Sequence, residues 1–146
     1  MGIKNKPHVN VAAGIIWKGS ELLISKRPQE SHLGGLWEVP GGKLKEGESL
    51  EECLRREILE ELGLCVHVSA AVLSVDHEYT HKTVSLHFFD CIWKDGEPRA
   101  LGCEEFRWIE PACISAFKFP PPDIQMVELI KRRAKNHNLF EQTESV

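Results

Sequence analysis

The sequence predicts a fold of the mixed α/β (α+β) class, and two observations carry this prediction. Short apolar segments that are typical of strands recur along most of the chain and are separated by turn residues. Two stretches have helical spacing instead, one in the middle of the chain and one near its C-terminal end. Strands therefore dominate, and we expect a mixed sheet with helices packed on it.

The elements can be assigned in order along the chain. Strands are expected at residues 9–17, 21–26, 37–39, 65–76, 82–93 and 105–109. The first is almost entirely apolar, so it is expected in the centre of the sheet. Residues 1–8 form a polar lead-in that we expect to be loose, and residues 111–116 a short helical turn. The last helix is expected at 123–136, followed by a frayed tail at 139–146.

Length and composition favour one domain over residues 1–146, with a core at about 8–135. The net charge of −4 argues against stable binding of duplex nucleic acid, but it allows a small phosphorylated substrate. The five cysteines are scattered without a CxxC pair, and the first residues lack an apolar signal segment, so we expect a cytoplasmic protein. No apolar run reaches membrane-spanning length, and the oligomeric state, monomer or homodimer, stays open.

The central helix has clear sequence signals at both ends. Ser49 and Glu52 have the spacing of a capping box, and Gly63 fits the position just after a helix end. Before the helix, Gly41-Gly42 and Gly47 are expected as backbone breaks with positive φ available. The buried face is predicted from apolar residues at helical spacing, namely Leu50, Cys53, Leu54, Ile58 and Leu62.

Three carboxylates lie on or beside this apolar face rather than opposite it. Glu57, Glu60 and Glu61 are adjacent like charges, which an isolated helix disfavours. Arg55 and Arg56 are expected to project away from this edge, so a divalent cation that binds carboxylate oxygens and bridges to phosphates fits better. The alternative interpretation is an ordinary amphipathic helix with a surplus of Glu.

The spacing of residues 41–64 resolves this choice. It consists of Gly42, five residues, Glu48, seven residues, Arg56-Glu57-Ile58, one residue, Glu60-Glu61, one residue and Gly63-Leu64. This pattern matches the signature box of the Nudix hydrolases at every defined position, and the chain resembles that family over roughly residues 8–135. The resemblance implies an α-β-α sandwich with a mixed sheet. It also implies hydrolysis, with Mg²⁺ or Mn²⁺, of a nucleoside diphosphate linked to another group.

The resemblance and the residue chemistry together assign roles within the box. Glu57 is expected to bind the metal and to orient or deprotonate the attacking water. Glu60 and Glu61 are expected as further metal ligands, and the Gly41 carbonyl could add another. The family implies that Arg56 orients Glu57 or Glu60 by charge-assisted hydrogen bonds.

Substrate contacts are expected from residues outside the acidic helix. Arg27 and Lys43 flank the box and can hold phosphates, although each could also be a solvated surface cation. Tyr79 could pack on a base. The full set of expected substrate-binding residues is Arg27, His32, Val39, Lys43, Tyr79 and Asp123.

Further segments resemble the MutT type of the family, namely Val11–Ile16, Ser25–Arg27, Leu36–Lys43, Gly96-Glu97-Pro98 and Phe119–Asp123. That type converts 8-oxo-dGTP to its monophosphate and pyrophosphate. Asp123 stands where that type has an Asn, and an ionised Asp can accept N7–H of 8-oxoguanine but repels O6. Asp123 would instead suit the exocyclic amine of cytosine or adenine, or it could simply cap the last helix. Gly102 stands where that type has a further metal-binding Glu, so Glu104 or Glu105 could substitute for it.

Two alternatives to 8-oxo-dGTP hydrolysis therefore remain. One is a pyrophosphohydrolase for CTP or modified cytosine nucleotides. The other is a non-catalytic module that reads a nucleotide or a lesion, which the complete set of acids in the box disfavours.

Residues 77–81 read HEYTH and match the HExxH pattern of zinc proteases. That chemistry needs a helix that places both His on one face. The flanking residues here are typical of strands, so we expect a loop without zinc.

Overall fold

The computed structural model describes residues 6–144, with side chains described up to residue 136. The elements are β1 (His8–Lys18), β2 (Glu21–Lys26), β3 (Trp37–Glu38), β4 (Gly41–Lys43), α1 (Leu50–Leu62), β5 (Cys65–Glu78), β6 (Thr83–Asp95), β7 (Glu105–Ile109), η2 (Pro111–Ala116), η3 (Pro121–Asp123) and α2 (Ile124–Glu144). Of the ends expected to be loose, 1–8 and 139–146, residues 1–5 and 145–146 lie outside the described residues. The rest of that expectation is wrong at His8, which begins β1, and at 139–144, where the α2 backbone continues.

The expected ends of β5, β6 and the terminal helix are wrong. The terminal helix does not end near residue 136, because the α2 backbone continues to Glu144. Strand β5 runs to Glu78, so His77 belongs to the strand and only the residues after it form the turn to β6. The HEYTH sequence is therefore half strand and half turn, and the helix that a zinc-protease site requires is not formed there.

The strands within the described part of the chain form one mixed seven-stranded sheet. Its main path runs β3-β2-β1-β6-β5, while β4 pairs with β1 and β7 pairs with β2. Strand β1 is central, as expected, and is parallel to β6 from His8↔Thr83 to Trp17↔Ile92. The other pairings are antiparallel. Strand β3 pairs with β2 and β4 pairs with the middle of β1, and Gly14 N donates to the Pro40 carbonyl at 2.8 Å, so the short segment between β3 and β4 is held against the sheet.

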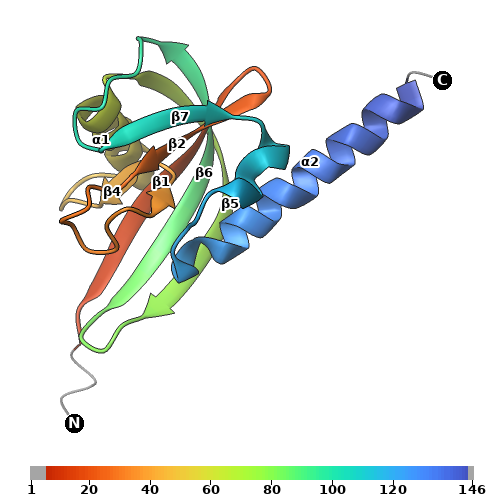
Figure 1. Cartoon of the computed structure of the whole chain (residues 1–146). Coiled ribbons are helices and arrows are strands. Elements are labelled where there is room, and N and C mark those ends of the chain that lie inside the picture. The colour runs from red at the N-terminus through yellow and green to blue at the C-terminus, as the bar shows by residue number, and fades with distance from the viewer. Residues whose placement is uncertain (1–5, 145–146) are drawn as a thin grey trace.

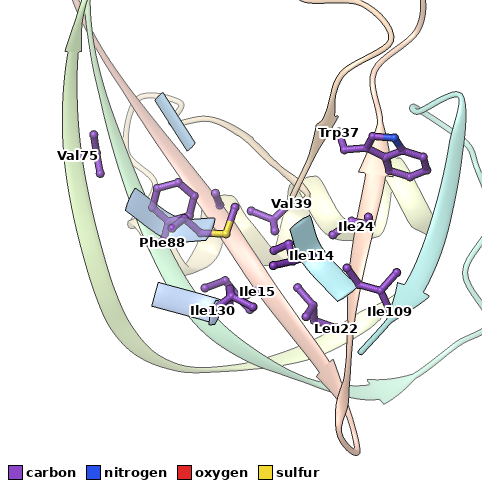
Figure 2. Packing of buried hydrophobic residues seen from close by; sticks show 12 residues of the cluster. Ile15, Leu22, Ile24, Trp37, Val39, Val75, Phe88, Ile109, Ile114 and Ile130 are labelled. Carbon is purple, nitrogen blue, oxygen red and sulfur yellow. The ribbon is translucent and has the colours of Figure 1, made fainter. Parts of the chain in front are cut away.

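The two faces of the sheet carry separate hydrophobic cores, which confirms the α-β-α sandwich. On one face, Leu54 and Ile58 of α1 pack against β1 and β6. On the other face, Ile114 of η2 with Met126 and Ile130 of α2 pack against the sheet. Figure 1 shows α2 along this face, and Figure 2 shows Ile114 and Ile130 among the core side chains. No helix in the part that the structure describes is both long and apolar enough to cross a membrane.

The predicted ends of α1 are confirmed. Both hydrogen bonds of the Ser49–Glu52 capping box are present, and Gly63 ends the helix with φ of 70°. Gly47 has φ of 82°, as expected, but neither Gly41 nor Gly42 has positive φ. These two glycines form strand β4, where a Cβ on Gly41 would overlap the Ala12 carbonyl oxygen. Close approach, rather than an unusual backbone conformation, therefore accounts for this pair.

Candidate active site

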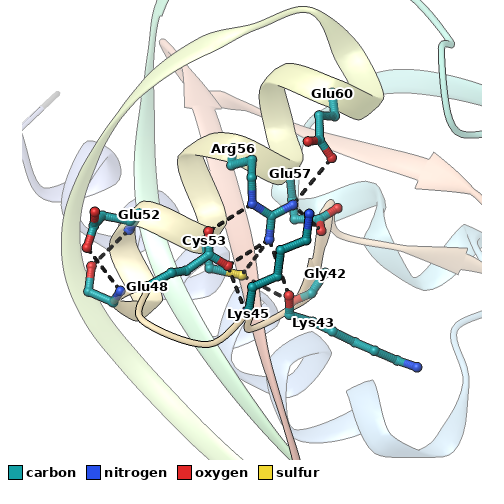
Figure 3. Close-up of polar contacts among 10 residues, drawn as sticks. Gly42, Lys43, Lys45, Glu48, Glu52, Cys53, Arg56, Glu57 and Glu60 are labelled. Atoms are coloured by element: carbon teal, nitrogen blue, oxygen red, sulfur yellow. Dashed lines mark hydrogen bonds and ion pairs between the residues drawn. The ribbon is translucent and has the colours of Figure 1, made fainter.

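Arg56 is the centre of a polar network that joins helix α1 to the loop before it (Figure 3). Its Nε and Nη2 donate to the two carboxylate oxygens of Glu48 at 2.8 and 2.7 Å. Its Nη1 donates to Oε1 of Glu57 at 2.8 Å and to Oε2 of Glu60 at 3.3 Å. Its Nη2 also donates to the Lys43 carbonyl at 3.3 Å. These bonds place Arg56 where it can orient Glu57 and Glu60.

The expectation that Arg56 projects away from the acidic edge is wrong. The helical spacing describes where its Cα lies, but the long side chain folds back along the helix and reaches the carboxylates. Arg56 therefore supplies part of the positive charge that the acidic cluster needs, whereas Arg55 is exposed. The hydrogen bonds from Arg56 also lower the pKa of Glu48 to about 2, which keeps that carboxylate ionised.

Glu57 is held against the backbone of β4. Its side chain is 17% exposed, and a Cβ on Gly42 would overlap its carboxylate. The absence of a side chain at Gly42 thus makes room for Glu57, so these two positions of the box depend on one another.

We expect Gly42→Ala to lower kcat by about 10²-fold while the melting temperature changes little. The added methyl group meets the end of a flexible side chain, so Glu57 can move aside, but a misplacement of about 1 Å is costly for catalysis. Gly47→Ala is the matched control, because Gly47 has positive φ and nothing within 4 Å. It should lower stability and spare the rate. Equal losses of stability in both variants would contradict this account.

Glu61 lies in a largely buried and acidic environment. Burial raises the pKa of Glu61 to about 8, and the negative charges of Glu38 and Glu57 act in the same direction, while a hydrogen bond from the Gly41 backbone opposes them. Glu61 is therefore largely protonated at neutral pH without a cation. A bound divalent cation would replace that proton.

Glu60 differs from the other two acids. Its side chain is 57% exposed and its carboxylate is paired with Arg56. Among the residues whose side chains are described, no three acidic, His or Cys groups are already arranged around a single point as metal ligands. The donor set still suits a hard cation, because Glu57 and Glu61 are close and largely desolvated, with Glu57 against Gly42 and Glu61 beside Gly41. Glu60 could join them only after leaving Arg56.

The structure gives no support to Glu104 or Glu105 as replacement ligands. Both carboxylates lie near Lys26, at 3.6 and 3.9 Å from its Nζ, and Glu105 also accepts from Arg107 at 3.2 Å. At the Gly102 position itself, an added Cβ would contact the Glu61 side chain at 3.2 Å. Residue 102 therefore does adjoin the acidic cluster, but this chain places no carboxylate there.

Three of the expected substrate-binding residues gather near one another. Arg27, directly after β2, donates from Nε to the His32 carbonyl at 2.7 Å. The His32 ring lies 6.1 Å from the Tyr79 ring, which connects the loop after β2 to the end of β5. Lys43 and Val39 differ from these. Lys43 is an exposed residue of β4, and Val39 is buried in the core.

Asp123, the last residue of η3, is buried with only 8% exposure. Burial raises its pKa to about 7; the charge of Glu38 adds to this effect and that of Arg27 opposes it. The hydrogen bonds of the described residues include none to its carboxylate, although a side chain that capped α2 would make one. The capping interpretation therefore has no geometric support.

Glu38 was not among the expected site residues. Its Oε1 accepts from Nη1 of Arg27 at 3.0 Å, and its charge raises the pKa of both Glu61 and Asp123. The Glu38 charge thus acts on both the acidic helix and Asp123. The sequence offered one signal for Glu38, which is a single acid between the apolar residues Trp37 and Val39. The structure shows that both of these neighbours are buried.

A helix-flanked mixed sheet, with a loop–helix–loop that carries three acids against a glycine pair, defines a Nudix hydrolase. The chain belongs to this family, since the family model described as NUDIX domain matches residues 12–129.

Individual relatives share most of the chain. The 8-oxo-dGTP diphosphatase of Proteus vulgaris is 40% identical over 86 residues, which cover 58% of this chain and 77% of that protein. The CTP pyrophosphohydrolase of Escherichia coli (strain K12) is 32% identical over 120 residues, covering 82% and 89%. The crystal structure of the MutT protein from Methanosarcina mazei Go1 has a TM-score of 0.78 and 27% identity, covering 89% and 97%.

Proposed function

We propose that the chain hydrolyses a phosphoanhydride bond of a nucleoside triphosphate and releases the monophosphate and pyrophosphate. The observation that carries this proposal is the pair of desolvated acids, Glu57 and Glu61, held beside Gly41 with Arg56 at one side. Mg²⁺ or Mn²⁺ would be held by these acids and the Gly41 carbonyl, where it would neutralise phosphate charge and activate water. Glu57 is then the group that orients the water and accepts its proton.

The names of several relatives, each an 8-oxo-dGTP diphosphatase, favour 8-oxo-dGTP as the substrate. The burial of Asp123 removes the chemical objection to this substrate. Because its pKa is about 7, a large fraction of Asp123 is protonated at neutral pH. A protonated carboxyl has one O–H donor and one free acceptor, the same pattern as an Asn amide. It can donate to O6 and accept from N7–H of 8-oxoguanine.

A cytosine nucleotide is the second candidate, supported by the CTP pyrophosphohydrolase of Escherichia coli. In its ionised form Asp123 only accepts, which suits the exocyclic amine of cytosine. A non-catalytic reading module is disfavoured because Glu57, Glu60 and Glu61 are all present and Arg56 is placed to orient them. The five free thiols fit the reducing cytoplasm expected for such an enzyme.

The direct test is a panel of oxidised and normal nucleoside triphosphates with Mg²⁺ or Mn²⁺, compared by kcat/KM. The proposal expects release of pyrophosphate and a preference for 8-oxo-dGTP over dGTP. Metal-dependent binding of nucleotides without any product would favour the reading module instead. A preference for CTP would favour the second candidate.

Metal should stabilise the folded chain. A cation that binds only the native acidic cluster raises stability by mass action, by about 2.7 kcal/mol at a hundred times its Kd, or about 5–10 °C in Tm. The measurement is a thermal melt in EDTA against one in millimolar Mg²⁺ or Mn²⁺. The shift should grow between pH 6.5 and 8.5, because the cation must displace the proton of Glu61. Glu61→Gln should reduce the shift, and an equal shift in that variant would place the metal elsewhere.

A further inference from the structure

The guanidinium of Arg27 is engaged on two sides, and neither partner is the buried carboxylate beside it. Its Nη1 donates to Oε1 of Glu38 at 3.0 Å, and its Nε donates to the carbonyl of His32 at 2.7 Å. The Arg27 and Glu38 side chains are 32% and 29% exposed. The pair therefore joins β2, β3 and the loop after β2 at the edge of the site.

Asp123 is the more buried carboxylate, yet it is the one without a partner. It is 8% exposed, and no hydrogen bond or ion pair within residues 6–136 reaches its side chain. No fully enclosed side-chain oxygen or nitrogen among these residues lacks a hydrogen-bond partner, so the Asp123 oxygens must still open to solvent. A desolvated carboxylate near an Arg would normally form a bidentate pair with it. Here Arg27 forms its ion pair with Glu38 instead.

We propose that Glu38 is a specificity-determining positioning residue, which holds the Arg27 guanidinium away from Asp123 and so keeps the Asp123 carboxyl free to contact the base. This assignment rests on the proposed function, in which Asp123 reads the base. Glu38 acts through Arg27, and it needs no contact with the substrate itself.

The charged groups around Asp123 support this division of roles. The negative charge of Glu38 raises the pKa of Asp123 and the positive charge of Arg27 lowers it, so both lie close enough to act on it. Strand β5 also contacts η3, and its C-terminal end carries His77, with Tyr79 directly after the strand. Their rings pack against each other, 4.6 Å apart. Burial and the charges of Glu38 and Arg27 therefore determine the protonation state of Asp123.

Removal of the Glu38 charge should change Asp123 in two ways. Glu38→Gln keeps the size of the side chain but weakens its hold on Arg27, so the guanidinium can turn to the buried carboxylate. An Arg partner at contact distance lowers a carboxyl pKa by about 1–3 units. The loss of the nearby negative charge acts in the same direction. Asp123 would then be ionised and occupied at neutral pH.

The experiment measures the titration midpoint of Asp123 by carbon NMR of the carboxyl groups in the full chain, without substrate. Asp123→Asn assigns the signal. We expect the midpoint to fall by about one pH unit or more in Glu38→Gln. In the double variant Glu38→Gln/Arg27→Met we expect part of that fall to be recovered, because no guanidinium remains to pair with Asp123. Glu128→Gln is the control, since Glu128 is an ion-paired carboxylate on the exposed side of α2.

A second readout is the ratio of kcat/KM for 8-oxo-dGTP to that for CTP at pH 7. We expect Glu38→Gln to lower this ratio about tenfold or more, as the proton that serves O6 is lost. A midpoint of Asp123 that does not move in Glu38→Gln would overturn the proposal. So would an equal fall in the double variant, because the effect would not then pass through Arg27. Should no nucleotide be hydrolysed, the proposed function fails, while the titration still decides the role of Glu38.

Discussion

Replacing Glu57 by Gln should lower kcat by about 10²-fold or more and leave the fold intact. An amide is a weak ligand for a hard metal ion and cannot accept a proton from water. The substitution keeps the shape that fits against Gly42 and one acceptor for Arg56. The measurement is the steady-state release of pyrophosphate at saturating metal, together with a thermal melt in EDTA. Glu51→Gln is the matched control, because Glu51 is an exposed acid in the first turn of the same helix.

The melt separates a loss of chemistry from a loss of structure. Without metal, Glu57→Gln removes one negative charge beside Glu61, so the variant should be at least as stable as the parent chain in EDTA. Its gain of stability with Mg²⁺ should shrink. Near-normal kcat in Glu57→Gln would rule out Glu57 as the group that activates water and shift that role to Glu61.

The framework of the site could be predicted from sequence where the signals are local. The capping box at Ser49 and the end at Gly63 fix helix α1 through contacts within four residues, and both are confirmed. The strands were found because β1 and β2 are continuous apolar runs. The C-terminal limit of α2 was missed, since nothing in the residues after 136 requires the helix to stop.

The orientations within the site could not be predicted in the same way. Helical spacing places Cα atoms, so it could not show that the Arg56 side chain turns back to Glu57 and Glu60. The glycine pair suggested unusual φ angles, but β4 has ordinary ones and Gly42 is needed only because the Glu57 carboxylate lies against it. Both features depend on side-chain contacts in the folded structure, which the spacing of residues in the sequence does not show.

The base-reading side depends most on tertiary structure. Asp123 and Glu38 are 85 positions apart in the sequence, and their interaction requires η3 to dock beside β3. From sequence alone Asp123 could be treated only as ionised, which made it a poor reader of 8-oxoguanine. Its burial changes the chemistry, because a carboxyl with a pKa of about 7 can be donor or acceptor.

This leads to a pH dependence of substrate choice. Below pH 7 Asp123 is mostly protonated and suits 8-oxo-dGTP, whereas above pH 7 it is mostly ionised and suits an exocyclic amine. Between pH 6 and 8 the protonated fraction falls about tenfold and the ionised fraction rises about tenfold, so the ratio of kcat/KM for 8-oxo-dGTP to that for CTP should fall about 10- to 100-fold. The ratio is compared, rather than either rate alone, because the ionisation of Glu61 near pH 8 should change the rates for both substrates by the same factor and so cancel. A ratio that stays constant across this range would exclude Asp123 as the reader.

Asp123→Asn supplies the sharper form of the same prediction. The amide donates and accepts at every pH, so the variant should keep a high ratio at pH 8, about 10- to 100-fold above the parent chain, for a group worth about 1–3 kcal/mol. Ionisation of the base itself is unchanged by the variant, so any pH dependence that remains belongs to the substrate.

The stability of the folded chain gives an independent check. A carboxyl with a raised pKa favours the folded state below its unfolded pKa, and this contribution is lost as pH rises through about 7. Asp123→Asn should therefore gain stability relative to the parent chain between pH 6 and 8 in urea unfolding. If the two chains instead keep a constant difference in unfolding free energy across that range, the Asp123 carboxyl is ionised throughout, and 8-oxo-dGTP must then be recognised by other residues.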